Sequence, residues 1–151
     1  MKLSGNRNFT PAPEGNHLGV LVDVVDLGKQ PTKFGEKHMV KLIYQIDENM
    51  EDGKPFIVSG RFNATLAERS SLRKHVEAIR GVKFTKEELE DFEMDDLLGT
   101  NALLNIVWNE SDKGTFANIA SAVQYDKRFG DKIEPKDYIR VQDREGFGTE
   151  S

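Results

Sequence analysis

The chain has 151 residues, of which 37% are hydrophobic, so its length and composition predict one domain with a substantial apolar core. It contains no cysteine, which excludes a disulfide framework, thiolate chemistry and thiolate metal sites and fits a reducing compartment. The net charge of −5 is unevenly spread: residues 84–99 hold one lysine against seven carboxylates, whereas residues 28–83 hold eleven Lys or Arg against seven Asp or Glu. This pattern predicts a basic surface beside an acidic segment, and local potential matters more for binding than net charge.

The N-terminal residues 1–16 are polar and contain Pro11 and Pro13, so we expect an extended lead-in to the domain. They lack the apolar stretch of a signal peptide. The longest apolar run, residues 18–27, is interrupted by two aspartates and is too short to span a membrane. We therefore expect a soluble, cytoplasmic protein with no membrane partner.

The first strand is predicted over residues 17–26, because apolar residues recur there with a period of two. Apolar residues on both faces suit a strand that curves into a barrel. One face is expected to carry Leu18, Val20, Val22 and Val24, and the other Leu21 and Val25.

The most informative stretch is residues 28–47, in which a loop with glycine and proline over residues 28–36 leads into a second strand. A basic face continuing from a basic loop with one aromatic is suited to a single-stranded nucleic-acid groove. The alternative is a solvated edge whose lysines only discourage aggregation. The core side is expected to carry His38, Val40, Leu42, Tyr44 and Ile46, and the outer side Lys37, Met39, Lys41, Ile43 and Gln45.

An Asp-Gly pair in residues 48–55 predicts a hairpin connection into a third strand over residues 56–62. The pattern then changes, and apolar residues at helical spacing predict a helix over residues 70–80, with Ser70 or Ser71 as its N-cap and Gly81 just past its C-terminus. A Thr–Glu capping box predicts a second short helix over residues 85–92, followed by one further turn.

Strand signals return over residues 101–109 and 115–123, joined by a polar turn. The predicted fold is therefore mainly β, a five-stranded OB-fold barrel with helices between strands three and four. An SH3-like barrel lacks a helix of that length, and a ferredoxin-like sandwich would place a helix between the first two strands. We expect the barrel to span residues 17–125 and the charged residues 126–151 to form a mobile tail.

No pattern in the sequence indicates catalysis. The three histidines lie on separate predicted elements, so we expect no metal site. The sequence lacks the phosphate-binding glycine loop and the nucleophile elbow. Residues 47–58 lack the glycine and the glutamate of a calcium loop. We expect a binding protein that is not an enzyme and has no cofactor.

The candidate binding residues follow from the OB geometry, in which strands two and three form the ligand face between two flanking loops. We expect cationic side chains to track phosphates and aromatic side chains to stack with bases. Tyr44 is instead assigned to the core by its alternation. The candidate nucleic-acid-binding residues are Lys29, Lys33, Phe34, Lys37, Lys41, Arg61, Phe62, Trp108, Lys113 and Phe116.

Several strings in residues 16–124 occur in a distinctive order, namely DLGKQPTKFGEK, KLIYQID, DGKPF, SSLRKHVEAIRG and DDLLGTNALLNIVW. In this layout the chain resembles the short single-stranded DNA-binding proteins encoded by tailed bacteriophages, which are small OB-fold accessories of replication and recombination. The resemblance implies sequence-independent binding of single strands in the host cytoplasm and contacts with replication or recombination proteins. Many such proteins end in an acidic tail tipped by an aromatic, whereas here Phe147 lies in a weakly acidic tail.

Three hypotheses follow. The first is a single-stranded DNA-binding OB-fold protein, and the second is an OB-fold interaction module that docks a replication enzyme through its acidic segment or tail. The third is a metal-dependent nuclease accessory that uses the acidic run. The sequence leaves open self-association, the binding-site size and the choice between DNA and RNA.

Overall fold

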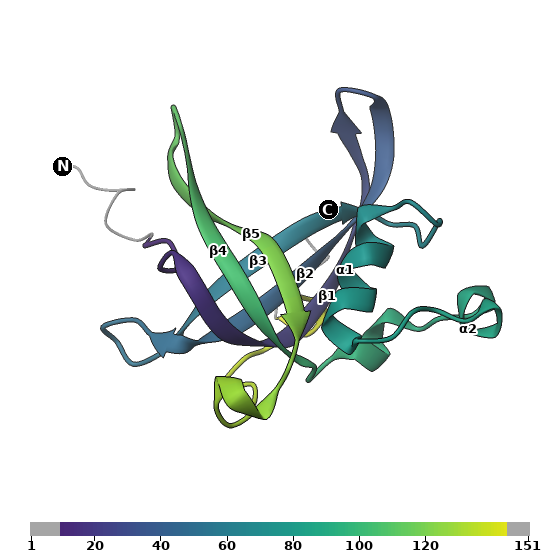
Figure 1. Ribbon diagram of the computed structural model, residues 1–151. Coiled ribbons are helices and arrows are strands. Elements are labelled where there is room, and N and C mark those ends of the chain that lie inside the picture. Colours follow the sequence, from purple (N-terminus) through teal and green to yellow (C-terminus); the bar gives the residue numbers. More distant parts are fainter. Residues whose placement is uncertain (1–9, 145–151) are drawn as a thin grey trace.

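The computed structural model describes residues 10–144 and is mainly β, with one five-stranded antiparallel sheet and few helices (Figure 1). The strand order is β3-β2-β1-β4-β5, and in the described part of the chain no ladder joins the edge strands to close the sheet. No helix within residues 10–144 is long and apolar enough to cross a membrane. The elements are β1 (Gly15–Thr32), β2 (Gly35–Asn49), β3 (Pro55–Asn63), α1 (Ser71–Arg80), α2 (Lys86–Glu90), η2 (Met94–Leu97), β4 (Asn101–Ser111), β5 (Gly114–Gln124), η3 (Lys127–Phe129) and η4 (Val141–Asp143).

Strands β1 and β2 form one long hairpin that extends well beyond the body of the sheet (Figure 1). The sequence predicts a loop over residues 28–36, but the ladder continues to the Thr32–Gly35 pair and leaves only Lys33 and Phe34 as the turn. The predicted loop is therefore wrong. Its basic side chains are held on paired strands, which fixes their directions far better than a loop would.

A bulge in β1 divides its apolar residues between the two faces of the sheet. The register shifts after Leu21 and leaves Val22 as an extra residue. Leu21 and Val24 consequently belong to the main core, whereas Val20 and Val22 belong to a second, smaller cluster. The prediction that Val20, Val22 and Val24 share one face is wrong, because a strict period of two cannot accommodate the inserted residue.

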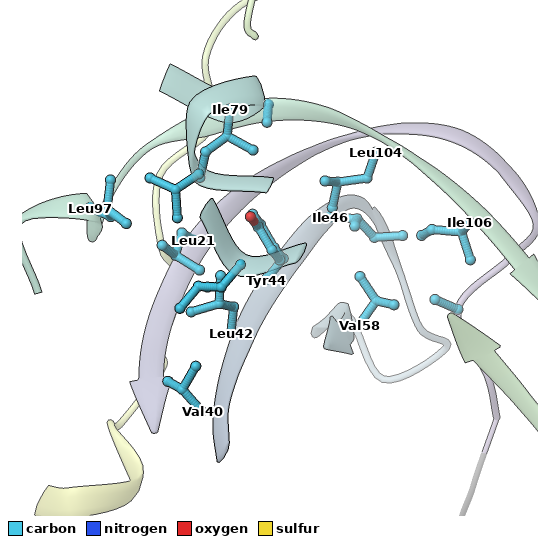
Figure 2. Packing of buried hydrophobic residues seen from close by; sticks show 14 of the residues in the cluster. Leu21, Val40, Leu42, Tyr44, Ile46, Val58, Ile79, Leu97, Leu104 and Ile106 are labelled. Atoms are coloured by element: carbon cyan, nitrogen blue, oxygen red, sulfur yellow. The ribbon is translucent and has the colours of Figure 1, made fainter. Parts of the chain in front are cut away.

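The main core lies between one face of the sheet and α1 (Figure 2). The helix turns Leu72, Val76 and Ile79 towards the sheet, and its N-cap is Ser70, one of the two serines predicted for that position. Strand β2 contributes Val40, Leu42, Tyr44 and Ile46, all buried, which confirms the core side predicted for these four residues. His38, the fifth residue of that set, is exposed because it lies beyond the body of the sheet on the projecting hairpin.

One polar pair lies within this packing. The Tyr44 hydroxyl and the His75 Nε2 atom are 2.6 Å apart, and the Phe62 ring lies 5.0 Å from the His75 ring. Burial lowers the pKa of His75 to about 4, because the charged imidazolium is poorly solvated there. Burial also raises the pKa of Tyr44. The pair is therefore neutral near pH 7.

This pair predicts an acid-sensitive fold. The pKa of His75 is about 4 in the folded chain against 6.5 when solvated, so the unfolded state binds the proton first as the pH falls. Above pH 6.5 His75 is neutral in both the folded and the unfolded state, so the fold has its full stability. As the pH falls to about 4, ~3 kcal/mol of unfolding free energy is lost. Urea unfolding at several pH values measures this loss. The His75→Gln variant should lack this part of the pH dependence, and an unchanged profile in that variant would contradict the assignment.

An acidic arm, defined as residues 81–97, follows α1 and reaches away from the sheet (Figure 1). The Arg80 guanidinium donates to both Glu88 carboxylate oxygens, at 2.7 and 3.1 Å. The Thr85–Glu88 capping box is present, as predicted. The Phe84 and Phe92 rings meet edge to face at 4.9 Å and attach the arm to the core.

The C-terminal strap, defined as residues 131–143, packs across the second face of the sheet. Ile133, Tyr138 and Val141 cover the second cluster, which consists of Val20, Val22 and Ile43. The prediction of a mobile tail from residue 126 is therefore wrong over the described residues. Phe147 lies outside them.

Two side-chain amides hold the strap by its backbone. Gln45 donates to the Lys136 carbonyl at 2.9 Å and accepts from the Lys136 N–H at 2.8 Å. Asn101 makes the same pair of bonds with Ile133, at 2.9 and 2.8 Å. Each side-chain amide pairs with the strap backbone as a neighbouring β-strand would. The backbone N–H and C=O groups of Ile133 and Lys136 are therefore all hydrogen-bonded.

A fully buried carboxylate anchors the end of the strap. Asp23 is 0% exposed and accepts hydrogen bonds from the Tyr138 hydroxyl, the Arg140 Nε–H and the Val141 N–H, at 2.8 to 2.9 Å. Burial opposes ionisation of Asp23, but the bonds from Val141, Arg140 and Tyr138 outweigh it and hold its pKa below the ordinary value. The carboxylate is therefore charged near pH 7 and fully paired.

Candidate nucleic-acid interface

The tip of the β1–β2 hairpin carries four of the predicted site residues. Phe34 is 80% exposed at the two-residue turn, beside Lys33. The turn is fixed by Thr32, whose hydroxyl donates to the Gly35 carbonyl at 2.6 Å and accepts from the Phe34 N–H at 3.1 Å. Lys29 and Lys37 lie on the paired strands below the turn and are exposed.

A cationic ladder, defined as Lys37, Lys41 and Arg61, follows the outer face of β2 and β3. Lys41 and Arg61 are direct cross-strand partners, which places their side chains next to each other on one face. Lys37 lies on the same face of β2, four residues from Lys41, and is paired with Gln30 of β1. The ladder therefore runs from β3 across β2 towards the hairpin tip.

The strap limits this outer face. Beyond Lys41 the next outward side chains of β2 are Ile43 and Gln45, which the strap covers or hydrogen-bonds. The sequence predicts them as part of an open binding face, which is wrong because the strap occupies it. The free part of the face consists of residues 37–41 of β2 and the outward side chains of β3.

A groove of about 670 Å³ separates the two edges of the sheet, β3 and β5. Phe62 lies on its core-facing side, because it pairs with the buried Val40. Phe116 lines the opposite wall, and the N-terminal residues Pro11 and Ala12 lie at the groove. Arg61 lines the groove as well as belonging to the cationic ladder.

Trp108 lies on the core-facing side of β4, in phase with Leu104 and Ile106. It is 43% exposed, and its indole N–H donates to the Ala12 carbonyl at 2.7 Å. Register places Phe116 on the opposite face of the β4–β5 hairpin, since it pairs with Asn109. Lys113 lies in the turn of this hairpin, which projects towards the top of Figure 1 together with the β1–β2 hairpin.

The ten predicted residues therefore do not form one surface. The cationic ladder and the hairpin tip together make a basic region, in which Lys29 pairs with His38 and lies on the opposite face of the hairpin from Lys37. Arg61 also lines the groove that contains Phe62 and Phe116. Trp108 and Lys113 lie apart from the basic region, on the β4–β5 hairpin. Trp108 and Phe116 both lie near the turn of this hairpin, but β4 and β5 present them on opposite faces.

Sequence patterns did not predict the strap or the edge groove, since both depend on contacts between residues far apart in the chain. Within residues 10–144, no group of three or more histidine or acidic side chains is arranged to hold a metal ion. Comparisons with protein-family models and with curated proteins find no match to this chain. The geometry and charge of the surface are therefore the basis for assigning a function.

Proposed function

We propose that the protein is a sequence-independent single-stranded DNA-binding protein of the phage type, with an open OB-type barrel, that acts in DNA replication or recombination. The observation that supports this most is the cationic ladder, which continues into a hairpin tip with the exposed Phe34. Lysine and arginine side chains in a row can follow the phosphates of a strand, and an exposed aromatic ring can stack with any base.

The arrangement of strands favours the same proposal. The order β3-β2-β1-β4-β5, with α1 following β3 in the chain, is compatible with the partly open five-stranded OB barrel of the proposal. In such barrels the face of strands two and three binds the ligand between two flanking connections. Here the cationic ladder lies on that face, and the proposed role is binding in the host cytoplasm without a cofactor.

A second candidate function uses the acidic arm. Glu87, Glu90 and Asp91 are exposed on it, away from the basic region. A carboxylate-rich arm could dock a basic surface of a replication enzyme by charge complementarity. Neutralising the cationic ladder should greatly weaken DNA binding but leave such docking intact, so one variant separates the two functions.

Titration with oligo-dT, at low and high salt, tests the proposed function. We expect a saturable rise in the anisotropy of a labelled oligonucleotide at low salt and a steep fall in affinity as salt increases. Trp108 fluorescence in the same titration reports whether bases reach the β4–β5 hairpin. Absence of binding at low salt would overturn the proposal and favour docking through the acidic arm.

A further inference from the structure

The strongest unassigned site is a pocket of about 430 Å³ at the base of the β1–β2 hairpin. Its volume lies within the range of ~300–1,000 Å³ common for ligand sites. The walls come from the hairpin base, the loop before α1, the end of the acidic arm and the end of the strap. Its apolar lining consists of Val24, Val40, Ala64, Leu66, Leu72 and Met94.

The polar lining of this pocket is predominantly anionic. Asp26, Glu93 and Asp95 contribute carboxylates, against one arginine, Arg140, and one histidine, His38. The His38 Nε2 atom lies 2.6 Å from the Asp26 carboxylate. Arg140 donates to Asp95 at 3.2 Å and also to Asp23 at 2.9 Å, so its single charge is shared between two carboxylates and the lining keeps a net negative charge. Carboxylates around an apolar interior repel a phosphate backbone and attract a cationic segment that also carries an apolar side chain.

The hairpin tip has the complementary chemistry. It presents three lysines (Lys29, Lys33 and Lys37) against one glutamate, Glu36, all exposed. Between them stands Phe34, which is 80% exposed and has the highest exposure among the large hydrophobic side chains of the described residues. One apolar ring surrounded by ammonium groups matches an apolar pocket surrounded by carboxylates.

A tip cannot enter the pocket of its own chain. The paired strands from Asp26 to Thr32, with one register shift at Leu27, hold the tip roughly 20 Å from the hairpin base, at about 3.3 Å per residue. We therefore propose that the pocket receives the β1–β2 hairpin tip of a second copy of this chain. Because tip and pocket are different surfaces, each contact leaves one free tip and one free pocket, and copies join head to tail.

This contact uses the same tip lysines as the proposed DNA surface. Single-stranded DNA and the pocket of a neighbouring copy would therefore compete for the tip. The self-association does not depend on DNA binding, since it follows from the charges of the protein alone. Either property can fail in experiment without the other.

Sedimentation velocity of the full chain without DNA tests the proposal. We expect the average mass to rise with protein concentration at low salt and to return to that of the monomer at high salt. Phe34→Ser alters the tip, and Glu93→Lys alters the pocket rim. Both residues are exposed, and the Glu93 carboxylate caps η2 by accepting from the Asp95 N–H at the long distance of 3.3 Å. The fold should therefore persist, and each variant should weaken association at least tenfold. Glu90→Lys, on the same acidic arm but outside the pocket, is the matched control.

Mixing the two variants gives the sharpest test. The Phe34→Ser protein keeps an intact pocket and the Glu93→Lys protein keeps an intact tip, so an equal mixture should form dimers and nothing larger. A wild-type protein that stays monomeric at low salt overturns the proposal. So does a mixture that forms no dimer, or a Glu90→Lys variant that loses association to the same extent as Glu93→Lys. Anisotropy with labelled oligo-dT, measured separately, decides the proposed function.

Discussion

Replacing Lys37, Lys41 and Arg61 together by glutamine is expected to lower the affinity for oligo-dT by about two to three orders of magnitude at about 50 mM salt. Each cation that neutralises a phosphate adds ~0.7 to the slope of log affinity against log salt for single strands. The triple variant should therefore show a slope reduced by about 2. Anisotropy titrations at several salt concentrations measure both quantities.

The control removes the same charge from elsewhere on the surface. Lys54, Lys86 and Lys127 are exposed and lie outside the cationic ladder and the hairpin tip. Their triple glutamine variant should keep most of the wild-type slope. If it loses as much slope as the ladder variant, binding depends on general charge and the ladder has no special role. Phe34→Ser should weaken binding by ~1–3 kcal/mol without changing the slope, because stacking releases no counterions.

The sequence contained enough local information to predict the number and order of the main elements. Alternation in β2 correctly placed Val40, Leu42, Tyr44 and Ile46 in the core. Ser70 and Gly81 marked the ends of α1, and a Thr–Glu pair marked the start of α2. All of these signals lie within a few residues of the feature they specify.

The failures have a common physical cause, which is dependence on distant partners. Asp23 and the Arg140 guanidinium that it binds are more than one hundred residues apart in the chain. The same is true of Val22 and the strap that covers it. Val22 could not be recognised as a bulge from period alone. The strap also has few apolar residues, at irregular spacing, and its backbone is satisfied by the amides of Gln45 and Asn101. Its composition is therefore that of a solvated tail.

The residue types of the candidate site could be predicted from the sequence, but the positions of their side chains relative to one another could not. Four of the predicted basic and aromatic residues are exposed, as binding residues must be, namely Lys29, Lys33, Phe34 and Lys37. The face to which each side chain points depends on register, which placed Trp108 and Phe116 on opposite sides of their hairpin. The pocket at the hairpin base combines four separate segments and leaves no local sequence signal.

The largest expected effect on stability comes from Arg140→Ala. Asp23 is fully buried and donates nothing, so its charge depends on the three donors that the strap supplies. Removing the guanidinium leaves a buried carboxylate with only two of them, and we expect the free energy of unfolding to fall by ~3–5 kcal/mol. Urea unfolding measures this loss. Hydrogen exchange at the amides of Ile133, Lys136 and Val141 should accelerate, because the strap loses its anchor.

Two comparisons separate an orphaned charge from a general loss of packing. Asp23→Asn in the Arg140→Ala background removes that charge, so the double variant should be more stable than Arg140→Ala alone. Arg128→Ala deletes an exposed arginine paired with Asp126 and should change little. The folded-state pKa of Asp23 lies below its ordinary value of 3.8. The anchor's contribution is therefore complete above about pH 4 and is lost as the pH falls through the folded pKa. Strap amides whose exchange stays unchanged in Arg140→Ala would show that the two side-chain amides alone hold the strap.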